Sequence, residues 1–313
     1  MLGALIHGLR RTAAAPGLVI LLWLASLVAA LPAAVMVQEA IHRSVGTSLA
    51  RESLREGFDT GWFGEFEAAS EGLPATLSPS HTGVGAVFDA LDAWWNGDLF
   101  RMPVSTLVFG VTFALLWLFL LGGALTRLHR PRDRMGWVDV VAAGGRLFPR
   151  YLRLAVLSAP LYYGVFRLAG WLFPKIEHLT RDVTLERTVL VYNMLAAVLI
   201  VLLLALVKMV GDYAKIAIVV ENRRSSVLAF LAGCGFVLRH PISTLGLVSL
   251  FAVLTMALIA AFAAVAPGAR ESTVVGIILA IAASQVFLVL RTALRLGLLA
   301  SQVVLFDEQR RRI

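Results

Sequence analysis

Residues 188–210 read TVLVYNMLAAVLIVLLLALVKMV, an apolar run in which Lys208 is the only charged residue. A transmembrane helix needs about 20 mostly apolar residues to cross roughly 30 Å of hydrocarbon. Backbone polar groups in lipid must find their hydrogen bonds within the same segment, which a helix provides. This stretch therefore predicts a membrane-spanning helix.

Five more segments have the same character: about 17–37, 104–125, 153–174, 242–266 and 273–294. Of the 313 residues, 59% are hydrophobic and 15% are charged, and the mean hydropathy is +0.82. An average soluble chain is nearer half apolar and a quarter charged. The first segment is also longer than the apolar core of a signal peptide, so we count it as a span. We predict an all-α, polytopic fold with six spans in a single membrane domain, residues 1–313.

The charges lie in blocks between these segments. Arginines precede the first span and are concentrated in the second and fourth connections and the C-terminal tail. The segment 38–103 instead contains ten acidic residues and four arginines. Basic connections stay in the cytoplasm. We therefore predict that both termini are cytoplasmic and that 38–103, 175–187 and 267–272 lie outside. This placement also explains the net charge of +8 without nucleic-acid binding.

The basic residues also carry a compositional signal. Only three of the 28 are lysine. Such a preference for arginine is typical of a GC-rich bacterial genome, so the predicted location is the bacterial inner membrane.

A short amphipathic stretch with Gly, apolar residues, Arg and Pro precedes the first, third and fifth spans, at 7–16, 144–150 and 235–241. Such a helix lies in the membrane interface with its apolar face toward lipid. Proline would then end it, because proline removes a backbone donor and restricts the residue before it. We predict three repeated units, each an interfacial helix followed by a helix hairpin. Alternatively, any cytoplasmic entry into the membrane attracts these residue types.

The segment 38–103 is predicted to be an extracytoplasmic helical cap. Its first part continues the helix of the first span, and a second amphipathic helix covers 84–95. Phe58, Trp62, Phe63 and Phe66 alternate with acidic residues between them. We expect these aromatic rings at headgroup level, where Trp prefers to lie. The cap would also serve as a surface for a protein partner.

Ionisable residues within spans are functional candidates by default. Arg167, Tyr192 and Asn193 lie at similar predicted depth in the third and fourth spans. Together they would form a ligand-binding cluster for an anionic headgroup or substrate. The simpler alternative is that Arg167 reaches the outer surface and pairs with Glu177 or Glu186.

A second polar group lies at the inner ends of the spans. Lys208, Asp212 and Lys215 follow one another at helical spacing, and Arg291 and Arg295 end the last span. We predict an inter-helix lock between Asp212 and Arg291 or Arg295. A proton relay is the less favoured alternative, because no Asp or Glu lies deep in any predicted span.

No catalytic motif is present in the sequence: there is no H-E-x-x-H, G-x-S-x-G, Walker A or dinucleotide-binding glycine pattern. The six His are scattered and Cys234 is the only cysteine, so a Cys-based metal site is excluded. We expect no enzyme activity, no metal and no cofactor.

Residues 211–216 read Gly-Asp-Tyr-Ala-Lys-Ile and are followed by Glu-Asn-Arg-Arg-Ser at 221–225 and an amphipathic stretch at 227–238. Gly122-Gly123 also precede the basic stretch 127–134. These features resemble uncharacterised six-span bacterial inner-membrane proteins, which carry an Asp-Tyr-Ala-Arg/Lys-Ile motif after their fourth span. The resemblance implies an architecture and no biochemistry.

These observations favour a non-enzymatic membrane scaffold or an accessory subunit of a membrane complex. It would bind membrane lipids and a protein partner through the outer cap and the interfacial helices. The alternative is a permease or lipid-handling protein that uses the cluster between spans three and four.

Overall fold

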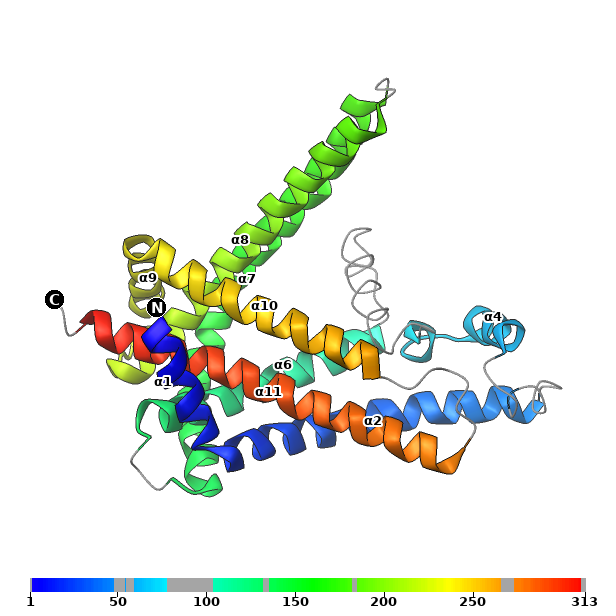
Figure 1. Ribbon diagram of the computed structural model, residues 1–313, viewed down its shortest axis with the longest axis horizontal. Helices are drawn as coiled ribbons and strands as arrows, with labels where there is room; N and C mark the ends of the chain where they lie inside the picture. The colour runs from blue at the N-terminus through cyan, green and yellow to red at the C-terminus, as the bar shows by residue number, and fades with distance from the viewer. Residues whose placement is uncertain are drawn as a thin grey trace. The chain divides into compact units, whose positions relative to one another are not determined.

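The structure, a computed structural model, describes residues 2–47, 54, 59–77, 104–131, 135–181, 185–265 and 273–310. Every element in these ranges is a helix (Figure 1). Six helices are long and apolar enough to cross a membrane: α2 (Pro16–Thr47), α6 (Val104–His129), α7 (Trp137–Thr180), α8 (Glu186–Val220), α10 (Pro241–Val265) and α11 (Val274–Arg310). The predicted all-α polytopic membrane fold with six spans is confirmed.

Shorter helices stand before or between the spans. They are α1 (Leu2–Ala13), α4 (Thr60–Ala69), the 3-10 helix η2 (Pro74–Thr76) and α9 (Ser226–Arg239). The hydroxyl of Ser225 accepts a hydrogen bond from the amide of Leu228 and so begins α9. The carboxylate of Asp59 does the same for α4 by accepting from Gly61 and Trp62. Both are N-caps, which satisfy amides that have no partner within the helix.

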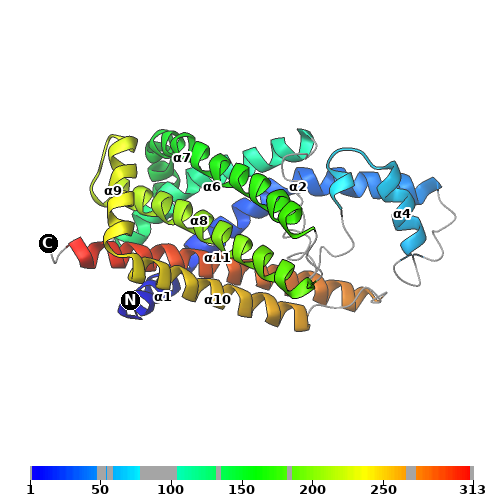
Figure 2. The same ribbon diagram turned by 90° about the horizontal axis from the view of Figure 1, so that it is seen from above.

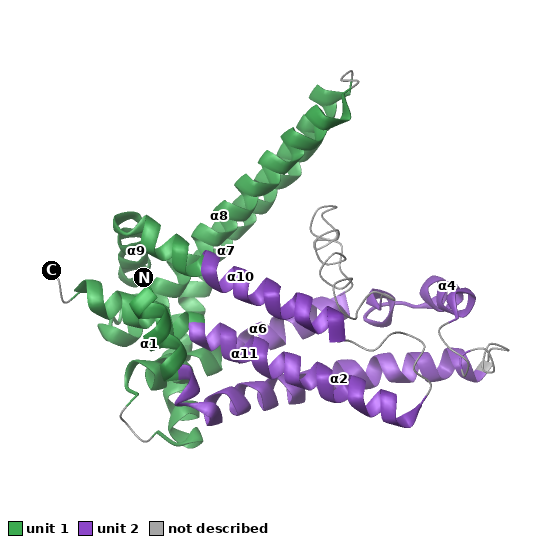
Figure 3. Cartoon of the chain, in the orientation of Figure 1, with its two compact units in different colours: residues 1–11, 118–248, 298–313 green, residues 12–117, 249–297 purple. Residues whose placement is uncertain are grey.

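The chain divides into two compact units (Figure 3). Unit 1 contains residues 1–11, 118–248 and 298–313, and unit 2 contains residues 12–117 and 249–297. The helices α6, α10 and α11 each contribute residues to both units.

Unit 1 contains the hairpin of α7 and α8. The two helices lie side by side in both views (Figures 1 and 2). The predicted third span, 153–174, is only part of α7, because this helix runs without a break from Trp137 and carries Pro149, Pro160 and Pro174 inside it. Proline within a helix removes one backbone hydrogen bond and bends the axis.

Unit 2 is held together around the membrane part of α11. The indole of Trp23 on α2 donates a 3.0 Å hydrogen bond to the side-chain oxygen of Gln285 on α11. The rings of Phe262 on α10 and Phe287 on α11 stack with their centroids 4.5 Å apart. A polar contact between two apolar helices fixes their rotation, while the stacked rings fill the adjacent space.

Aromatic residues of the predicted outer cap form a small core of their own. Trp62, Phe63 and Phe66 on α4 are buried, and they contact Ala40, Ile41 and Val45 on α2, together with Leu54 and Leu77. The indole of Trp62 also donates to the hydroxyl of Ser44. These three rings pack inside the protein, and the expected position of the cap at headgroup level stays a prediction. Phe58 and the predicted helix 84–95 lie outside the described residues.

Candidate functional site

Helix ends meet in unit 1 and enclose most of its fully buried side chains. We call this region the collar and define it as α1, α9, the first part of α7 (137–154), and the C-terminal ends of α6 (118–129), α8 (209–220) and α11 (298–310). Tyr151, Tyr213 and Leu305 are among its buried side chains. The large apolar residues farther out along α8, such as Val191 and Met194, are exposed by contrast.

Glycines allow the helices of the collar to touch backbone to backbone at three crossings. A Cβ atom on Gly144 of α7 would lie 2.6 Å from the carbonyl oxygen of Phe119 on α6. One on Gly233 of α9 would lie 2.6 Å from the carbonyl oxygen of Val210 on α8, and one on Gly8 of α1 would overlap Ser301 on α11. No Cβ atom fits at these distances, so each crossing depends on glycine.

These three contacts give the collar a cyclic order. At Gly144 the start of α7 contacts the end of α6, the helix before it in the chain. At Gly233, α9 contacts the end of α8, which is likewise the helix before it. The helix α1 precedes all six spans, and Gly8 places it on the end of the last of them, α11. The threefold repeat itself stays a prediction, and these contacts are compatible with three units arranged in a ring.

The register of the repeat differs from the prediction. Pro16 begins α2 and Pro241 begins α10, and each follows its contact glycine, Gly8 or Gly233, at the same spacing (16 − 8 = 241 − 233). At the same spacing after Gly144 the chain has Leu152, and α7 continues there without interruption. The expectation that Pro149 ends an interfacial helix is therefore wrong, because this proline lies in a different register and within α7.

Arginines on α1 and α7 donate hydrogen bonds near the ends of other helices. The guanidinium of Arg11 on α1 donates a 3.1 Å hydrogen bond to the carbonyl oxygen of Leu128, near the end of α6. Arg150 on α7 donates to the side chain of Asn222 and to the carbonyl oxygen of Arg223, just after α8. The last carbonyls of a helix have no partner within it and carry partial negative charge, so a cation there is stabilising.

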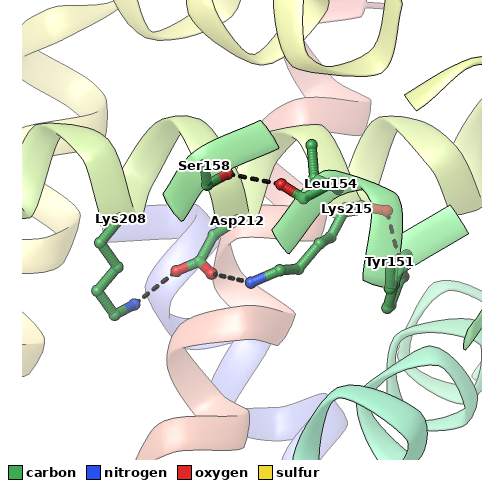
Figure 4. A network of polar contacts seen from close by, with 6 residues as sticks. All are labelled: Tyr151, Leu154, Ser158, Lys208, Asp212 and Lys215. Atoms are coloured by element: carbon green, nitrogen blue, oxygen red, sulfur yellow. Dashed lines mark hydrogen bonds and ion pairs between the residues drawn. The ribbon is translucent and has the colours of Figure 1, made fainter. Parts of the chain in front are cut away.

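Asp212 is buried on α8 between two lysines of the same helix (Figure 4). Its Oδ2 accepts from Lys208 at 2.5 Å and its Oδ1 accepts from Lys215 at 3.2 Å. The helical spacing of these three residues is confirmed as an ion-paired triad. The hydroxyl of Tyr151 on α7 donates to the carbonyl oxygen of Lys215 and ties the triad to the neighbouring helix.

The predicted lock between Asp212 and Arg291 or Arg295 stays a prediction. Asp212 lies in unit 1 and both arginines lie in unit 2. Each oxygen of the carboxylate already accepts from a lysine. The guanidinium of Arg295 lies over the ring of Trp117 on α6, 4.1 Å from its centroid.

The Asp-Tyr-Ala-Lys-Ile stretch is a packing motif in this structure. Tyr213 is fully buried against Phe236 on α9 and Phe306 on α11, with ring centroids 4.5 Å and 6.4 Å away. Ala214 lies under Gly233, and Ile216 is fully buried. Every position of the motif therefore faces a neighbouring helix or pairs a charge.

One buried polar residue was not predicted from the sequence. Gln302 on α11 is fully buried, and neither its amide nitrogen nor its oxygen has a hydrogen-bond partner among the described residues. The buried hydroxyl of Tyr213 also has no hydrogen-bond partner among the described residues. No motif marks Gln302 in the sequence, because its burial comes from helices that are distant in the chain.

The structure does not join the predicted ligand-binding cluster by any described contact. The side chains of Arg167 and Tyr192 are exposed on α7 and α8. The side-chain amide of Asn193 donates a 3.1 Å hydrogen bond to the carbonyl oxygen of Val189 on its own helix. These residues therefore present separate polar groups.

Among the described residues, no group of three or more His, Cys, Asp and Glu is arranged to hold a metal ion. Burial raises the pKa of the Cys234 thiol, which lowers its reactivity as a nucleophile. No family model, curated protein or solved structure matches the chain. The function therefore has to be argued from the collar and from the surfaces of the spans.

Proposed function

We propose that this protein is a non-enzymatic scaffold or accessory subunit of a complex in the bacterial inner membrane, with both termini in the cytoplasm. The collar is the observation that carries the proposal. Its helices cross at glycines, and its charged side chains hold helix ends or pair with each other. Such an arrangement favours a fixed platform over a reaction centre.

The span surfaces support the same proposal. The apolar side chains of α8 and α11 are widely exposed, with Leu195 and Leu279 among them. Without a bulk hydrophobic force between helices in lipid, association depends on shape and on interhelical hydrogen bonds. A platform with a rigid end can present such faces to the helices of a partner.

The outer cap offers a second contact surface. Because Trp62, Phe63 and Phe66 point into their own core, the opposite side of α4 presents Glu65 and Glu67 to the exterior. An acidic face held on a small aromatic core suits a basic segment of a partner protein. Complementary charge mainly guides encounter and selects the partner.

The test is to express the tagged chain at its natural level in the source bacterium and to recover it in native-like nanodiscs for mass spectrometry. We expect one protein at fixed stoichiometry. We expect its recovery to fall when Glu65 and Glu67 are both replaced by lysine, and to be unchanged in the control Glu39→Lys, at another exposed acidic residue on α2. Recovery of the chain without any protein partner would contradict the proposal.

An Arg167→Ala variant tests the alternative in the same experiment. If a lipid or small anion stays bound and is lost in this variant, a permease or lipid-handling function would replace the scaffold function. The retained protein partner and the retained small molecule are thus separate readouts.

A further inference from the structure

Two arginines on α11 stand where an apolar span ends. Arg291 and Arg295 are one helical turn apart, and both side chains are exposed. Arginine within a span is rare and marks a functional position by default. Neither residue belongs to the collar as defined above.

Their depth follows from helix geometry. The helix α11 begins at Val274, on the far side of the span from both arginines. At about 1.5 Å of rise per residue, Arg291 lies about 26 Å and Arg295 about 32 Å along the axis from that first residue. The hydrocarbon core is about 30 Å thick, so the pair lies at its boundary, where lipid phosphates begin.

One of the two guanidinium groups is already oriented. Arg295 lies over the indole ring of Trp117 on α6, and both residues belong to unit 2. A cation over an indole face is held by the ring's electrons, and Trp prefers the membrane interface. The N–H donors of a guanidinium lie along the edge of its plane, and this edge is the part that binds a phosphate bidentately.

We propose that Arg291, Arg295 and Trp117 form a binding site for the phosphate of an anionic phospholipid. The leaflet is the one nearer the C-terminal end of α11, which is the cytoplasmic leaflet in the orientation proposed above. The two arginines bind the phosphate and the indole holds one of them in place. This site goes beyond the scaffold function, because it assigns a lipid class to a specific place on the chain.

The test uses the full chain in nanodiscs of phosphatidylcholine that contain brominated phosphatidylglycerol, which quenches nearby Trp fluorescence. We expect stronger quenching than with brominated phosphatidylcholine, and we expect the excess to vanish in Trp117→Phe. The apparent affinity for the anionic lipid should fall roughly fivefold for each arginine replaced by glutamine. Arg224→Gln, at an exposed arginine between α8 and α9, is the matched control and should leave the affinity unchanged.

Additional experiments identify the ligand and separate loss of binding from loss of folding. Arg291→Lys with Arg295→Lys keeps the charge and should retain part of the preference, which distinguishes loss of binding from loss of folding. If inorganic phosphate in solution displaces the brominated lipid, the site binds a phosphate group, but its ligand is a soluble phosphate and not a lipid. Equal quenching by both brominated lipids, or an unchanged preference in the Arg291→Gln, Arg295→Gln double variant, would overturn the proposal.

Discussion

Gly144 and Gly145 are neighbours in α7 with opposite surroundings. A Cβ at Gly144 would lie 2.6 Å from the backbone oxygen of Phe119, whereas a Cβ at Gly145 would lie 3.7 Å from the ring of the same residue. The first distance is a clash and the second is an ordinary contact. Sequence alone marks both glycines as small residues at a membrane entry. It cannot separate them, because the difference depends on which helix crosses α7.

We therefore expect Gly144→Ala to lower the free energy of unfolding by about 1–3 kcal/mol through overpacking. Gly145→Ala, the control, should be neutral or more stable, because alanine favours a helix by about 1 kcal/mol over glycine. Thermal unfolding of the two variants in the same detergent provides the comparison. Equal midpoints would show that the α6–α7 crossing is looser than described.

Removal of the Asp212 carboxylate leaves two lysines without their shared partner. Loss of one member of a buried ion pair is strongly destabilising, but Lys208 is half exposed and is partly screened. We expect Asp212→Asn to cost about 1–3 kcal/mol, and Lys208→Gln to cost less because Asp212 keeps Lys215. Unfolding midpoints in detergent rank the stability of the two variants. A larger loss of stability for Lys208→Gln than for Asp212→Asn would contradict this prediction.

At the level of elements, hydropathy predicted the six spans but not the full lengths of their helices. The predicted third span starts at 153, whereas α7 already begins at Trp137, and the predicted sixth span stops at 294, whereas α11 continues to Arg310. A window scaled to lipid thickness detects only the part that lipid covers. The extensions are stabilised by the collar, where Tyr151 and Val303 are buried by other helices. The predicted lysine–aspartate triad needed only local helical spacing, so it could be read from the sequence.

The prolines of the repeat should respond differently to substitution. Pro241 begins α10 after the break at His240, where its missing amide costs nothing, whereas Pro149 interrupts the hydrogen bonds of α7. We expect Pro149→Ala to leave the unfolding midpoint unchanged or to raise it, and Pro241→Ala to lower it. Circular dichroism during heating measures both. A stabilised Pro241→Ala variant would contradict the register assigned here.

For the whole molecule, the predicted orientation can be tested by cysteine labelling. In a Cys234→Ala background, Glu65→Cys should react with a membrane-impermeant maleimide in intact cells. Arg130→Cys, in the connection between α6 and α7, should react only after the membrane is opened. The distribution of arginines predicts that the basic connections lie inside. Labelling of Arg130→Cys in intact cells would therefore show that the predicted orientation is reversed.

The unmodified chain, which keeps Cys234, serves as a separate control for that experiment. Its thiol is partly buried on α9, and burial raises its pKa, so less thiolate is present at neutral pH. We expect the unmodified chain to label slowly even in opened membranes. Slow labelling would show that the Cys234→Ala replacement removes only a small background signal.

The contact between Gly8 and Ser301 also sets a timetable for biosynthesis. The ribosome makes α1 before α11, so the surface that receives α1 is complete only after Ser301 has been added. At about 5–20 residues per second, synthesis of the intervening chain takes about 15–60 s. A nascent chain, or one that stops early, therefore carries α1 with its glycine face uncovered.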